Sequence, residues 1–142
     1  MNQGFKMINK IFQINLTSEE VKTVNEKGHH SVPRQICKLD LSCKPNAVEI
    51  AQEALENGYY NHVANIRADN LEQVFEYGNI GPEFKIERYI HPSYLPMASV
   101  SVGDVVANED GYWLCARCGW EKLNYEADGP LEEFPTTDVN RY

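Results

Sequence analysis

Apolar and polar residues alternate along the start of the chain, between positions 10 and 16. Because successive side chains of a β-strand point to opposite faces, this pattern predicts a first strand. Residues 34–41 and 84–90 show similar alternation and are predicted to be strands, and residues 59–66 are predicted to be a further strand. The segments between the first three strands have a helical period instead.

The first helical segment has strong start and stop signals. Thr17 and Glu20 have the spacing of a capping box, and Leu16 with Val21 matches a hydrophobic staple. Gly28 is a typical residue at a helix end. The segment therefore predicts a surface helix over residues 18–27.

The second helical segment begins at Pro45, a residue that is well tolerated in a first helical turn. Five apolar residues then recur with helical spacing and form one stripe: Ala47, Ile50, Ala51, Ala54 and Leu55. Gly58 is predicted to end this helix.

A third, shorter helix is predicted after Asp69, which together with Glu72 forms another cap pair. Leu71, Val74 and Phe75 supply its apolar residues, and Gly78 is predicted to close it.

Residues 100–123 predict a small antiparallel β-meander. Val-rich and aromatic runs are separated there by Gly103-Asp104 and by Asp110-Gly111, which are typical turn pairs. Trp113 and Trp120 are expected to contribute large buried areas on facing strands.

Together these elements predict one α+β domain over residues 10–123. Its N-terminal part alternates strands with two or three helices, and its C-terminal meander, for which an SH3-like arrangement is one option, leads into an acidic tail. Residues 1–9 are expected to be a flexible N-terminus. Residues 124–142 hold five acidic residues and one basic residue, a net charge of −4, and are expected to be a peripheral or flexible tail.

The chain as a whole is acidic, with 21 acidic and 13 basic residues and a net charge of −8. Such a charge repels phosphate and favours basic protein surfaces, so direct nucleic-acid binding is not expected. No apolar run approaches the roughly 20 residues that span a bilayer, and the first residues lack the features of a secretory signal. We expect a cytoplasmic protein with reduced thiols and no membrane partner.

Part of the sequence resembles YodL-like domains and related uncharacterised small proteins of bacteriophages and mobile elements. The resemblance lies in the segments 99–106, 111–113 and 119–120 of the meander and in the upstream segments 57–60, 68–75 and 78–81. It implies an origin, a phage or mobile-element product that acts in the host bacterial cytoplasm. It implies no particular activity.

Cys115 and Cys118 form the motif with the clearest chemical potential, Cys-x-x-Cys followed by glycine. Two thiolates at this spacing can face one Zn²⁺, which needs four ligands. Cys37 and Cys43 are the candidate partners, and His29 and His30 are further options. The alternative interpretation is that Cys115 and Cys118 are simply two small residues at a turn. We assign no metal, cofactor or catalytic residue from the sequence.

Other candidate residues are scattered. The histidines His29, His30, His62 and His91 have no nucleophile or carboxylate at a recognisable spacing. A set of aromatic and arginine residues is typical of interaction surfaces: Tyr59, Tyr60, Tyr89, Tyr94, Trp113, Trp120, Arg67, Arg88 and Arg117. About half of those on strands must face the core.

The sequence therefore favours a non-enzymatic protein of phage or mobile-element origin that binds a host protein as an inhibitor or modulator. One alternative is a DNA mimic that blocks a restriction or defence complex. The other is a small zinc-binding module that uses Cys115 and Cys118. The identity of the partner and the oligomeric state do not follow from the sequence.

Overall fold

The computed structural model describes residues 7–79, 86–88 and 99–125. Its elements follow one another along the chain as β1 (Met7–Gln13), α1 (Ser18–Lys27), the 3₁₀ turn η1 (His29–Ser31), α2 (Pro33–Cys43), α3 (Ala47–Glu56), β2 (Asn61–Ala68), α4 (Leu71–Asn79), β3 (Ile86–Arg88), β4 (Val105–Asn108), β5 (Gly111–Ala116) and β6 (Gly119–Lys122). None of the helices in these ranges has the length and apolar content needed to cross a membrane.

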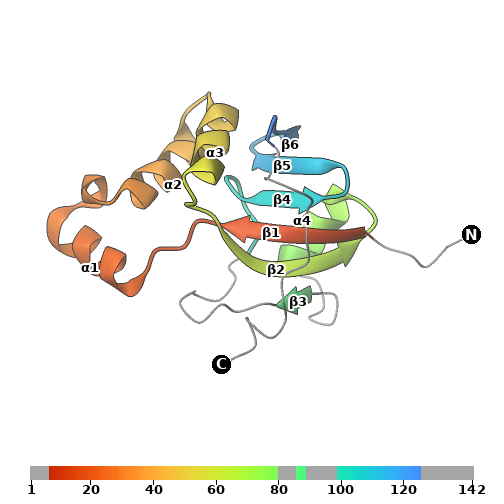
Figure 1. Cartoon of the computed structure of the whole chain (residues 1–142), viewed down its shortest axis with the longest axis horizontal. Coiled ribbons are helices and arrows are strands. Elements are labelled where there is room, and N and C mark those ends of the chain that lie inside the picture. The colour runs from red at the N-terminus through yellow and green to blue at the C-terminus, as the bar shows by residue number, and fades with distance from the viewer. Residues whose placement is uncertain (1–6, 80–85, 89–98, 126–142) are drawn as a thin grey trace, which may run out of the picture.

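The six strands in the described part of the chain belong to one sheet with the order β3-β2-β1-β4-β5-β6 (Figure 1). Every neighbouring pair is antiparallel. The predicted α+β class and C-terminal meander are confirmed. The meander pairs through β4 with β1, so it forms one half of a shared sheet, and β1 lies in the middle.

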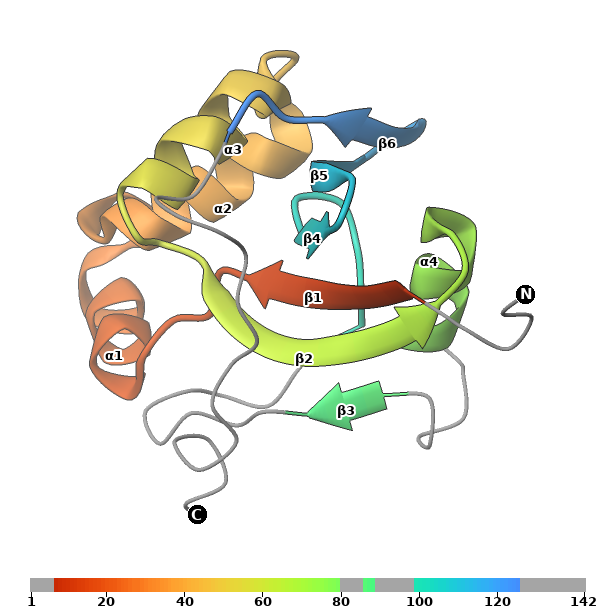
Figure 2. The same ribbon diagram turned by 45° about the vertical axis from the view of Figure 1, so that its right-hand side comes forward.

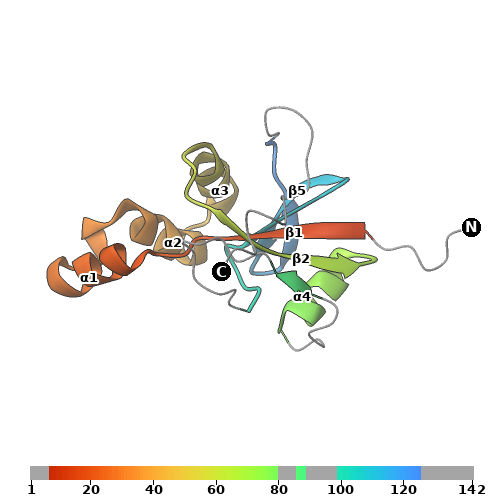
Figure 3. The ribbon, with the colours of Figure 1, turned by 60° about the horizontal axis from the view of Figure 1, so that its bottom comes forward.

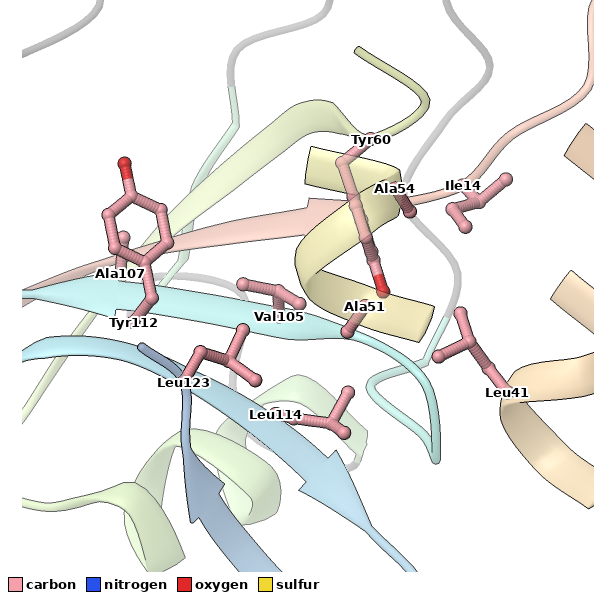
Figure 4. Packing of buried hydrophobic residues seen from close by; sticks show 10 residues of the cluster. All are labelled: Ile14, Leu41, Ala51, Ala54, Tyr60, Val105, Ala107, Tyr112, Leu114 and Leu123. Atoms are coloured by element: carbon pink, nitrogen blue, oxygen red, sulfur yellow. The ribbon is translucent and has the colours of Figure 1, made fainter. Parts of the chain in front are cut away.

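Helices cover both faces of this sheet, and Figure 3 shows α3 and α4 on opposite sides of it. The first core cluster lies on the face covered by α2 and α3, where Ala51 and Ala54 pack near Val105 and Leu114 (Figure 4). The second cluster lies on the face covered by α4 and includes Val74.

The predicted strand at 34–41 is wrong, because these residues form helix α2. Pro33 occupies the first helical turn, where its missing N–H is harmless. Cys37 and Leu41, four residues apart, both contact the first core cluster, whereas Leu39 is 38% exposed. Cys37 and Leu41 thus belong to one apolar stripe of the helix, and the exposed Leu39 between them gives the sequence the appearance of alternation.

The N-terminal boundary also differs from the prediction. Met7 to Asn9 were expected to be flexible, but they belong to β1 and pair with β2. Of the predicted acidic tail, only Asn124 and Tyr125 are described. The ring of Tyr125 meets that of Tyr112 edge-on at 4.9 Å between centroids, so Tyr125 belongs to the folded domain.

The predicted capping box of α1 is confirmed, since Thr17 and Glu20 exchange hydrogen bonds of 2.9 and 3.1 Å. The helix ends at Gly28, which has φ +99°. The cap of α4 differs by one residue from the prediction. Asn70, rather than Asp69, accepts a hydrogen bond from the Gln73 amide at 2.9 Å.

Gly78 does not end α4 as predicted, because the helix continues to Asn79. Gly78 instead allows α4 to come close to the segment that contains Val100. A Cβ atom at this position would collide with Cγ2 of Val100 and would lie 3.5 Å from Cδ1 of Ile66. Glycine therefore allows α4 to pack tightly on the second core cluster.

Candidate functional site

The two cysteines of the Cys-x-x-Cys motif have different environments. Cys115 is buried on β5, and Cys118 is exposed in the turn before β6. The backbone of Cys115 is fixed because its N–H donates to the Asp104 carbonyl at 2.9 Å and its carbonyl accepts from the Gly103 N–H at 2.8 Å. Burial raises the pKa of the Cys115 thiol to about 11, so this thiol is protonated at neutral pH.

The other two cysteines both lie on α2 but differ in exposure. Cys37 packs against the first core cluster, and burial raises the pKa of its thiol to about 11. Cys43 is exposed and lines, together with Cys118, a hollow of about 280 Å³. The two exposed cysteines therefore line one hollow, whereas Cys37 and Cys115 do not line it. Within the described ranges no three His, Cys, Asp or Glu side chains gather in a metal-binding arrangement.

The histidines are distributed over separate parts of the fold. His29 and His30 are exposed in η1, and Gln35 lies 3.1 Å from Nδ1 of His29. His91 lies outside the described residues. Of the three histidines that the structure describes, only His62 lies inside the folded sheet.

His62 lies on β2 with 4% of its surface exposed, and its ring stacks on Phe12 at 5.2 Å. Its Nε2 lies 2.7 Å from Oδ1 of Asn65. Burial lowers the pKa of His62 to about 4. The hydrogen bond with Asn65 acts in the opposite direction, and the charge of nearby Lys10 lowers the pKa further. This imidazole is therefore neutral at physiological pH and is part of the core packing.

Asp104 follows the predicted Gly103 corner, where Gly103 has φ +99°. Its Oδ2 accepts hydrogen bonds from Gln13 Nε2 at 2.9 Å and from the Ser101 N–H at 3.0 Å. Burial nevertheless raises the pKa of this carboxyl to about 6, because the two hydrogen bonds offset only part of the desolvation. The arrangement ties β1 to the start of β4.

An open groove lies between α4 and the β5–β6 hairpin, and we call it the α4–hairpin groove. It consists of two adjoining hollows that share Glu72, Gly119 and Trp120. The first, the apolar hollow, has a volume of about 290 Å³ and includes Phe75 and Arg117. The second, the acidic hollow, has a volume of about 400 Å³. Both volumes are close to the lower end of the range of known ligand sites.

Two tryptophans form the aromatic part of this groove. Trp113 and Trp120 share one face of the hairpin, because Trp113 pairs with Lys122 and Cys115 pairs with Trp120. As expected, they lie on facing strands, and each is also partly exposed. Nε1 of Trp113 donates to Oδ1 of Asn108 at 3.3 Å, which restrains the orientation of the indole.

The predicted aromatic and arginine set is only partly brought together. Trp113, Trp120 and Arg117 lie at the groove, while Tyr60 is buried and its hydroxyl donates to the Gly103 carbonyl at 2.6 Å. Arg67 is exposed on β2 and does not line either hollow of the groove. Tyr89, Tyr94 and the side chain of Arg88 lie outside the described residues.

Sequence reasoning missed Phe75, which was assigned to the apolar side of its helix and is 44% exposed. It also missed Glu72 and Asp110 as groove residues. Their positions in a helix start and in a turn are typical of capping and turn chemistry, so nothing in their spacing indicated a shared hollow.

No protein-family model matches this chain, and no curated protein or solved structure matches it either. The resemblance to YodL-like domains therefore stays a prediction.

Proposed function

We propose that this protein acts by binding another protein through the α4–hairpin groove. The observation that supports the proposal is the exposed ring of Phe75, which lines a hollow beside the half-buried ring of Trp120. Exposed aromatic side chains next to a concave surface are typical of interaction sites, since they bury much area at little entropic cost.

The neighbouring strand offers a second means of attachment. Among the strands that the structure describes, β6 forms a ladder only with β5 and lies at the end of the sheet order. Figure 2 shows β6 at the outer end of the sheet, beyond β5. The outer backbone groups of such an edge strand can pair with a strand from another protein.

The charge of the chain indicates what kind of partner would associate. With a net charge of −8, the protein attracts basic surfaces and repels acidic ones. In keeping with the resemblance described above, the proposed partner is a protein of a bacterial host, which this protein would inhibit or modulate without catalysing a reaction.

The test is capture of partners from a bacterial lysate at low ionic strength by the immobilised protein. Phe75→Ser removes the exposed ring in the groove, and Val21→Ser is the matched control, because Val21 on α1 is exposed to the same degree, 43% against 44%. We expect the wild type and the control to retain one stoichiometric protein and Phe75→Ser to lose it. Equal capture by all three, or no stoichiometric partner, would contradict the proposal.

A further inference from the structure

The two hollows of the α4–hairpin groove differ in charge. The apolar hollow includes Phe75, Arg117 and the shared Glu72, so it has one charged residue of each sign. The acidic hollow includes three carboxylates, from Asp69, Glu72 and Asp110, and no lysine or arginine from the described residues. A positively charged group is therefore favoured more strongly in the acidic hollow than in the apolar hollow.

The acidic hollow also has an aromatic wall, formed by Trp113 and Trp120. Guanidinium and ammonium groups are attracted to the face of an indole as well as to carboxylates. The chain itself places a cation in this way, because Nζ of Lys122 lies 5.5 Å from the centroid of the Trp113 ring. Aromatic rings and carboxylates together are a chemistry suited to an arginine or lysine side chain.

The register of the hairpin relates this hollow to the open edge of the sheet. Trp120 and Lys122 project to the same face of β6 as the groove residues Trp113 and Cys115 of β5. A strand added along β6 would send every second side chain to that face. Directly opposite positions on paired strands bring Cβ atoms within about 5 Å of each other, so such a side chain would lie beside Trp120.

We infer that the groove binds an extended segment of the partner protein, which pairs with β6 and places an arginine or lysine in the acidic hollow. An apolar side chain on the same face of that segment occupies the apolar hollow beside Phe75. The inference rests on the proposed function and adds the chemical nature of the partner's binding segment.

The probes are synthetic nine-residue peptides in which valine and threonine alternate around a central arginine, glutamine or glutamate. Titration calorimetry at low salt measures their affinities, and amide shifts of residues 119–122 with the two indole N–H signals report where they bind. We expect the arginine peptide to bind at least tenfold more tightly than the other two and to shift all of these signals.

A charge variant tests the hollow directly. Glu72→Gln with Asp110→Asn keeps the helix start and the turn but removes two carboxylates of the acidic hollow. We expect it to lose about tenfold in affinity for the arginine peptide and none for the glutamine peptide. The matched control is Glu49→Gln with Glu56→Gln, which changes the net charge equally on the exposed side of α3 and leaves both affinities unchanged.

The outcomes separate the two proposals. If a lysate protein is captured through Phe75 but the peptides bind equally whatever their central charge, or leave the β6 amides unshifted, the inference is wrong and the proposed function stands. If no lysate protein is captured, the proposed function itself is wrong. A dimer in sedimentation equilibrium that shields the β6 amides would assign the groove to a second copy of this chain and overturn the inference.

Discussion

The two faces of the sheet differ in how completely the described helices cover them. On one face, α2 and α3 enclose a cluster of ten buried residues, and Leu114 within it is 1% exposed. On the other face, the nine-residue α4 covers the second cluster but leaves Phe75 exposed and Trp120 half-buried. The described helices thus leave more aromatic surface exposed on one face of the sheet than on the other.

Small residues explain where each helix touches the sheet. Ala51 and Ala54 let α3 approach the first cluster, and Gly78 does the same for α4 against Val100. The close approach of α4 is at its C-terminal end, whereas Phe75 and Glu72 lie nearer its start and line the groove. A tightly packed end and an open end therefore coexist on one short helix.

The largest expected effect is on the face of the sheet that α2 and α3 cover, which we call the closed face. Leu114→Ala removes a fully buried side chain and leaves a cavity, which we expect to lower the free energy of unfolding by about 3 kcal/mol. Urea denaturation measures it. Leu39→Ala is the control, since Leu39 is 38% exposed on α2, and a loss equal to that of Leu114→Ala would contradict the assignment of the closed face.

The next effect concerns the tight end of α4. Alanine normally stabilises a helix relative to glycine, by up to about 1 kcal/mol. At Gly78 the added methyl collides with Val100, so we expect Gly78→Ala to destabilise the protein by about 2 kcal/mol.

The double variant Gly78→Ala, Val100→Ala controls for this cause. Removing the γ-methyl groups of Val100 makes room for the new methyl, so the two changes should cost less together than the sum of their separate costs. Strict additivity in urea denaturation would show that the collision is not the reason.

Local signals predicted much of this fold. The capping box of Thr17 and Glu20 and the turn glycine Gly103 were found correctly, because each depends on neighbours a few residues away. Residues 34–41 were mistaken for a strand because Leu39, an exposed apolar side chain, mimicked alternation. Only the packing of α2 on α3 shows that Leu39 is on the outer side.

The candidate site was less predictable, because it is assembled from segments far apart in sequence. Trp120 was singled out, but its neighbours Glu72 and Phe75 belong to a helix more than forty residues earlier. The Cys-x-x-Cys spacing drew attention to Cys115 and Cys118, yet the fold buries one thiol and exposes the other. Spacing shows which residues are neighbours in the chain and not which faces meet.

A smaller effect concerns Asp104, at the corner before β4. Its pKa is raised by burial from 3.8 to about 6, so the folded protein binds this proton more tightly than the unfolded chain does. The resulting stabilisation is complete below pH 3.8 and is lost as the pH rises through 6. Between pH 4 and 7 we expect the wild type to lose roughly 1.5 kcal/mol relative to Asp104→Asn, since one pKa unit is about 1.4 kcal/mol and the carboxyl is partly exposed.

Urea denaturation of both proteins at pH 4, 5, 6 and 7 isolates this carboxyl, because the other acidic residues titrate alike in the two. A wild type that instead gains stability relative to the variant as the pH rises would show that the hydrogen bonds from Gln13 and Ser101 outweigh burial.

The smallest expected effect on stability is the most informative about the other face, where the α4–hairpin groove lies. Phe75→Ser removes a large aromatic side chain, and a buried phenylalanine would cost about 3 to 5 kcal/mol when truncated. Because 44% of Phe75 is exposed and it lines a hollow, we expect the free energy of unfolding to fall by less than about 1 kcal/mol. A loss as large as that of Leu114→Ala would mean that the ring belongs to the core, and the contrast between the two faces would then disappear along with the role proposed for the groove.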